Sequence, residues 1–161
     1  MKTLTAVCLF AIAAVAAPFA AAQPAGAGSD LAALREANKS AAAKKAHVES
    51  ALDLSAAERR KFWPVYDAHQ RKLDANNRRY NRAIEDMIAV GTDKPVTDAY
   101  AKQVAAELVA VQEADARAMR AMHNAMMKAV APRVALRYMQ IENRLQAVRR
   151  ADVALGLSLV R

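Results

Sequence analysis

Apolar residues recur at the helical period over two long stretches, and this pattern constrains the fold more than any other feature. One stretch follows residue 55 and the other follows residue 97. The stripe of the first is Phe62, Tyr66, Leu73, Tyr80, Ile84 and Met87. That of the second is Tyr100, Val104, Leu108, Val111, Ala118, Met122, Ala125 and Ala129. Spacings of three, four and seven mark one face of an α-helix. Alternating β-branched runs bounded by turns are missing, so an all-α fold is expected.

The first long helix has a well-defined predicted start. Ser55 and Glu58 form a capping box, in which each side chain bonds the backbone amide of the other residue. Leu54 precedes the cap at the position of a hydrophobic staple. Pro64 favours a kink or a broken first turn, because an interior proline removes one helical hydrogen bond. Gly91 is the predicted stop.

Two further helices are predicted on either side of residue 130. Thr97 can cap the helix that carries the second stripe, after a linker over residues 92–96. Pro132 fits the first turn of a last helix that ends at Gly156. The stripe of that helix is Val134, Tyr138, Ile141, Leu145 and Val148, with Leu155 in phase.

An N-terminal helix is expected to begin at Ser29 or Asp30. Its apolar stripe is thin, and an alanine run with Lys44 and Lys45 suggests that it docks only in part. The stripe consists of Leu31, Leu34, Ala41, Val48 and Leu52. The prediction is therefore four helices, of which two span roughly 45 Å each. Such long helices with narrow stripes predict an elongated helical hairpin that dimerises.

The N-terminus predicts export. Lys2, an apolar run from Leu4 to Ala17, and small residues at 20–22 follow the order of a secretory signal peptide. We expect cleavage after Ala22 and a periplasmic protein, with a flexible leader over 23–29 and one helical domain over 30–161. Cleavage removes Cys8, the only cysteine, and with it any disulfide or thiolate chemistry.

Residues 54–62 carry a resemblance to a known family. The run Leu54-Ser55-Ala56-Ala57-Glu58, followed by Phe62, looks like the L-T-x-x-Q motif of the Spy/CpxP-like periplasmic proteins, with Ser for Thr and Glu for Gln. A second copy, Val130-Ala131-Pro132-Arg133-Val134, with Tyr138 after it, keeps the position of the motif without its polar residues. The resemblance covers most of residues 30–155. It implies a cradle-shaped homodimer whose relatives act as ATP-independent chaperones, stress-signalling adaptors or metal sensors.

The charge of the chain bears on its partners. The formal net charge is +8, and removal of Lys2 lowers it by one. A basic exported protein meets anionic lipid head groups or acidic unfolded chains rather than nucleic acid. The alternative is that the charge serves solubility alone. No nucleophile–base pair, phosphate loop or zinc-protease motif is present, so neither an enzyme nor a cofactor is expected.

Residues 119–127 form the sharpest local cluster and leave several hypotheses open. Met119, His123 and Met127 share one helical face, and thioethers with an imidazole suit Cu(I) or Ag(I). Alternatively, Met122 and Met126 lie on the core stripe and the other residues only line its edge. A third hypothesis is a basic, methionine-containing surface for unfolded or membrane-associated clients, or for a membrane sensor. Its residues are Arg117, Arg120, Met126, Lys128 and Arg133.

Overall fold

The computed structural model describes residues 27–90 and 95–157, and within them the protein is entirely helical. The helices are α1 (Ala27–Ala37), α2 (Ala41–Ala51), α3 (Ala56–Val90), α4 (Asp98–Ala129) and α5 (Pro132–Leu155). The predicted signal peptide, most of the leader, Gly91 and the last four residues lie outside the described residues. No described helix has both the length and the apolar character that crossing a membrane requires.

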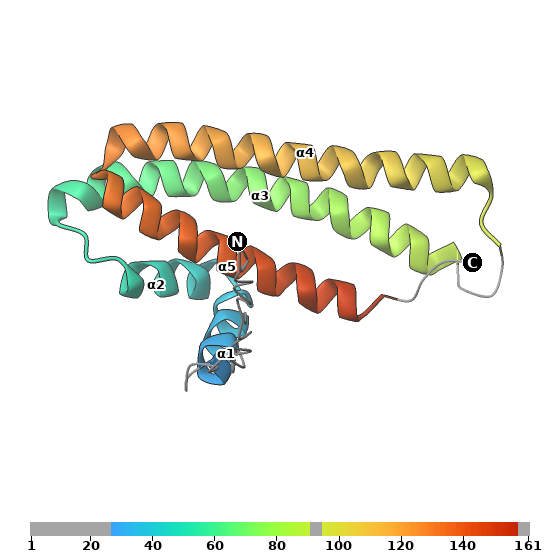
Figure 1. Cartoon of the computed structure of the whole chain (residues 1–161), viewed down its shortest axis with the longest axis horizontal. Helices are drawn as coiled ribbons and strands as arrows, with labels where there is room; N and C mark the ends of the chain where they lie inside the picture. Colours follow the sequence, from blue (N-terminus) through green and yellow to red (C-terminus); the bar gives the residue numbers. More distant parts are fainter. Residues whose placement is uncertain (1–26, 91–94, 158–161) are drawn as a thin grey trace, which may run out of the picture.

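The two longest helices form an antiparallel hairpin. α3 and α4 have 35 and 32 residues and lie side by side along their length (Figure 1). They are long because each carries an apolar stripe with no interior glycine to interrupt it. α5 turns back after Val130 and runs beside α3 (Figure 1). α1 packs on α5, and α2 contacts both α5 and α3.

Helix starts follow the predicted capping chemistry. The Ser55 amide donates to Oε2 of Glu58 at 3.0 Å, and the Glu58 amide donates to Oγ of Ser55 at 3.3 Å, which confirms the capping box. Oγ1 of Thr97 accepts from the Tyr100 amide at the start of α4. Pro132 occupies the first turn of α5, where its missing amide hydrogen costs nothing.

The prediction of a single N-terminal helix is wrong. The chain breaks over residues 38–40, where the amides of Asn38 and Lys39 close the last turn of α1. Ser40 is extended, and its side chain accepts from the Ala43 amide to begin α2. Residues 27–90 and 95–157 therefore hold five helices where four were predicted, because a local serine cap competes successfully with continuation of the helix.

Pro64 does not break the first turn of the helix, contrary to one of the two predicted outcomes. α3 is helical from Ala56 to Val90 with Pro64 inside it. The flanking aromatic residues Phe62 and Tyr66 are buried at 0% and 3% exposure. Burying two aromatic side chains is worth several kcal/mol, about as much as an interior proline costs.

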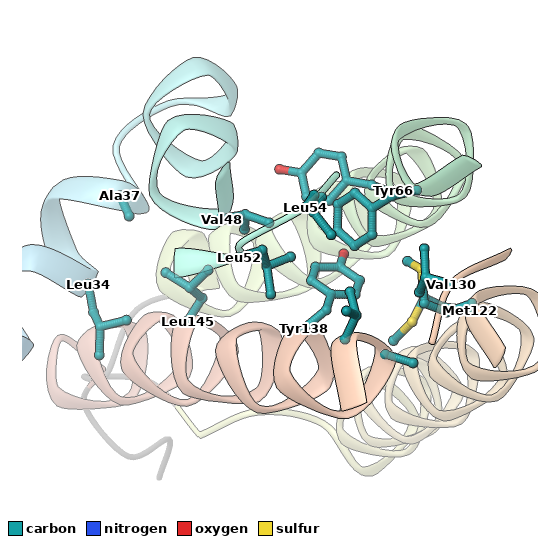
Figure 2. Packing of buried hydrophobic residues seen from close by; sticks show 14 residues of the cluster. Leu34, Ala37, Val48, Leu52, Leu54, Tyr66, Met122, Val130, Tyr138 and Leu145 are labelled. Atoms are coloured by element: carbon teal, nitrogen blue, oxygen red, sulfur yellow. The ribbon is translucent and has the colours of Figure 1, made fainter. Parts of the chain in front are cut away.

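The core lies where α2, α3, α4 and α5 meet. The Phe62 and Tyr138 rings contact edge to face, with centroids 5.1 Å apart and planes at 80°. Figure 2 shows Tyr138 and Leu145 extending from α5 towards Leu52, Leu54 and Tyr66. Leu54 stands eight residues before Phe62, and Val130 stands eight residues before Tyr138. All four residues are buried in this one cluster.

Candidate functional site

A buried carboxylate, Glu142 on α5, is the centre of the most unusual polar group in the described residues. Its side chain has no solvent exposure. The Lys44 ammonium donates to Oε1 at 2.7 Å, and the Gln70 amide donates to Oε2 at 2.9 Å. Gln146 donates to Oε1 at 3.0 Å, and the Tyr138 hydroxyl contacts Oε2 at 3.3 Å. Helices α2, α3 and α5 thus all supply donors to one carboxylate, as burial of a charge requires.

The Lys44 ammonium holds this carboxylate in its charged form. Burial by itself raises the pKa of Glu142, but the charge and hydrogen bond of Lys44, helped by Gln146, bring that pKa below its ordinary value. Lys44 is largely buried as well, with 13% of its side chain exposed. The pair therefore links α2 to α5. Removal of either partner should be strongly destabilising, because the other charge stays buried and unpaired.

His69 on α3 lies beside this cluster and has no hydrogen-bond partner. It is 2% exposed, and both ring nitrogens are without a partner. Burial, the largest effect, lowers the pKa of His69, so the ring is neutral near pH 7. His69 and Asn76 stand seven residues apart on the apolar stripe of α3, a spacing that predicts a polar layer in which both are hydrogen-bonded. That prediction is confirmed for Asn76, which donates to Asp115 at 2.8 Å, and wrong for His69.

A polar pocket opens next to Glu142 and has a volume of about 370 Å³. Asn38 and Lys44 line it from the N-terminal arm, by which we mean residues 27–51, that is α1, α2 and their connection. Gln70 lines it from α3, and Gln146 and Arg149 from α5. Burial lowers the pKa of Arg149, because the guanidinium is partly withdrawn from water. Residues of the N-terminal arm therefore form one wall of the pocket.

Four of the five residues predicted for the client surface are exposed, and one is buried. Arg117, Arg120, Lys128 and Arg133 are exposed. Met126 is wrong as a surface residue, since it is fully buried between the long helices and α5. Met126 follows Ala118 and Met122 at steps of four residues on the same face of α4, and that face is buried.

Two other apolar side chains on α4 and α5 are exposed, as Met126 was expected to be. Met127 is 42% exposed and Leu136 is 58% exposed. The sequence analysis did not identify Leu136. This residue lies outside the apolar stripe of α5, so its exposure could have been predicted. We call Arg117, Arg120, Met127, Lys128, Arg133 and Leu136 the basic surface.

The predicted metal ligands are not equally accessible. Met119 is partly buried against the core, whereas His123 and Met127 reach solvent. Nδ1 of His123 lies 3.2 Å from the side-chain oxygen of Asn124. Across residues 30–90 and 95–157, no three His, Cys, Asp or Glu side chains gather as a metal site would need.

The Lys44–Glu142 pair escaped sequence reasoning, although each half had a signal. Lys44 stands four residues before Val48 and eight before Leu52, on the same helical face. Glu142 stands four residues after Tyr138, at the edge of the apolar stripe of α5. A charged residue on an apolar face is a candidate for a buried ion pair, but the neighbouring residues in the sequence do not identify its partner.

No family model, curated protein or solved structure matches this chain.

Proposed function

We propose that this chain is a periplasmic helical binding protein that works without nucleotide, as a chaperone or as an envelope-stress adaptor. Clients or a membrane sensor would contact the basic surface. The resemblance of residues 54–62 to Spy/CpxP-like proteins supports the class of activity. The basic surface supports the way in which the protein would bind.

One observation carries the proposal. Within the described residues, Arg120, Lys128 and Arg133 are exposed and form no ion pair within 4.0 Å. Exposed apolar side chains, Met127 and Leu136, lie on the same two helices. A flexible thioether and a leucine among unpaired cations offer weak contacts to many acidic or unfolded sequences.

Light scattering of a chemically denatured test protein measures the proposed activity. The mature chain, residues 23–161, should suppress aggregation without ATP at a few-fold molar excess. Its mass, measured beforehand, should be that of a dimer. Scattering that is unchanged at ten-fold excess would overturn the chaperone role.

Matched variants test whether the basic surface is responsible. Arg120→Gln, Lys128→Gln and Arg133→Gln together should weaken suppression several-fold. The control triple Arg78→Gln, Arg82→Gln and Lys102→Gln removes the same charge from exposed positions elsewhere on α3 and α4. Equal losses in the two triples would assign the effect to net charge and not to this surface.

The apolar part of the basic surface needs its own comparison. Met127→Ser with Leu136→Ser should also weaken suppression. Ile88→Ser with Val109→Ser is the control, since these side chains are 63% and 56% exposed outside the basic surface. Binding to anionic vesicles that falls steeply with salt would instead favour a lipid-surface adaptor.

A soft-metal function is the second candidate. His123 and Met127 stand one turn apart on α4 and both reach solvent. An imidazole and a thioether at this spacing suit Ag(I) or Cu(I). Ag(I) should then raise the melting temperature of the protein, and His123→Ala with Met127→Ala should abolish that shift.

A further inference from the structure

We infer that the polar pocket beside Glu142 binds a small carboxylate that carries a hydroxyl or amino group close to its carboxyl group. Amino acids and sugar acids are the molecules of this class. The inference is independent of the proposed function, because none of the residues of the basic surface lines the pocket.

The first argument is the charge of the lining. Four cationic side chains face two carboxylates there; the cations are Lys44, Lys45, Arg71 and Arg149, and the carboxylates are Asp67 and Asp74. Lys44 is engaged by Glu142, which lies behind the wall, and the Lys45 ammonium lies 3.6 Å from Asp67 and 4.7 Å from the Trp63 ring centroid. Arg71 and Arg149 therefore outnumber the remaining carboxylate of Asp74, which favours a ligand that presents a carboxylate group to the arginines.

The second argument is a pair of unused hydrogen-bonding atoms on α5. Oε1 of Gln146 and Nε of Arg149 are buried with no partner, and both residues line the pocket. Gln146 offers an acceptor and Arg149 a donor, one turn apart. Buried polar atoms without partners cost free energy, so a ligand that supplies both partners is favoured.

The required ligand chemistry follows from these two atoms. A carboxylate oxygen would accept from the Arg149 guanidinium, and a hydroxyl or ammonium would donate to Gln146. Nη2 of Arg149, which is next to Nε on the same edge of the guanidinium, donates to Oδ1 of Asn77, so the group is oriented before a ligand arrives. Both atoms are out of contact with solvent, so each side chain must rotate to present its atom to a ligand.

The third argument is size and enclosure. The volume of about 370 Å³ is in the range of small-molecule sites. One wall is the N-terminal arm and the opposite walls are α3 and α5. A bound ligand would bridge these walls, so it should slow amide exchange in residues 41–51 as well as raise the melting temperature.

The test is isothermal titration of the mature chain with galacturonate, gluconate, glutamine and serine. Galactose and ethanolamine, which lack the carboxylate, are the matched compounds. At least one carboxylate should bind with a Kd below about 1 mM and slow exchange in α2, while its carboxylate-free counterpart does neither. A pocket that holds water only would show no binding of any of the four carboxylates, and that result overturns the inference.

Variants locate the binding. Arg149→Gln should weaken binding at least ten-fold, as expected for the loss of a hydrogen bond between charged groups. Gln146→Leu is a second variant in case the first folds poorly, and it should also weaken binding. Arg137→Gln, an exposed arginine of α5 outside the pocket, should leave it unchanged. Binding that survives both pocket variants would place the ligand elsewhere. Suppression of client aggregation should be the same in all three variants, so the two proposals can fail separately.

Discussion

The ammonium of Lys44 lies 2.7 Å from Oε1 of Glu142 and joins positions 98 residues apart in the chain. Glu142 has no solvent exposure and Lys44 has little, so this is a buried ion pair. Removal of either partner leaves a charge with no compensation in a region that water does not reach. The contact is the strongest candidate for what holds the N-terminal arm on α5.

Lys44→Met should lower the free energy of unfolding by about 3 kcal/mol, since it leaves the Glu142 carboxylate buried and unpaired. Urea denaturation followed by circular dichroism measures this loss. Lys44→Met with Glu142→Leu should cost much less, because neither charge remains. A double variant as unstable as the single one would contradict this account. Lys39→Met, at an exposed pair with Glu36, is the control and should change stability by less than about 0.5 kcal/mol.

His69→Leu should keep or raise stability, by up to about 1 kcal/mol, because it removes two buried nitrogens that have no partner. Asn76→Leu is the matched variant on the same face of α3. It breaks the hydrogen bond to Asp115 and should lower stability by about 1–2 kcal/mol. A large loss in His69→Leu, measured by the same urea titration, would mean that the ring has a partner in solution.

Stability should fall as the pH drops below about 6.5. The pKa of His69 is lowered by burial, so the unfolded chain binds a proton there more readily than the folded chain. Above the ordinary His pKa of 6.5 the ring is neutral in both states and costs no stability. As the pH falls from 6.5 towards the lower pKa of the folded state, stability is lost. The pKa of Glu142 is also lowered, so a further loss begins below its ordinary value of 4.5. Urea midpoints between pH 8 and about pH 3 measure both steps, and His69→Leu should remove the first.

Ser55→Ala should lower the free energy of unfolding by about 1 kcal/mol, because the Glu58 amide loses its cap. Thr97→Ala should cost a similar amount at the start of α4. Ser50→Ala is the control, since its hydroxyl bonds only the His47 carbonyl on an exposed turn. Thermal unfolding measures all three, and equal effects would mean that the capping box adds nothing.

Helix boundaries that depend on neighbouring residues were predictable. The capping box of Ser55 and Glu58, the Thr97 cap and the position of Pro132 each involve groups within one turn of the chain. The apolar stripes of α3, α4 and α5 were readable for the same reason, because the helical period is a local property. The break before Ser40 was missed, although Ser40 could have been recognised as a cap in an alanine-rich segment.

The candidate site was far less predictable than the helices. Met126 was assigned to the surface and is buried, and the exposure of Leu136 was overlooked. Lys44, Glu142, Gln146 and Arg149 were read only as parts of helices. What makes them a site is their position relative to one another, and α2 and α5 are separated by more than 80 residues in sequence.

The sequence by itself determined that the chain is helical, where its long helices begin, and which of their faces are apolar. Those features depend on backbone hydrogen bonds and on side chains three or four residues apart. Only the tertiary structure decided that Lys44 pairs with Glu142, that His69 is left without a partner, and that a polar pocket lies under the N-terminal arm. Pairing of this kind depends on which helix packs on which, and the free energy of that choice is spread over the whole core.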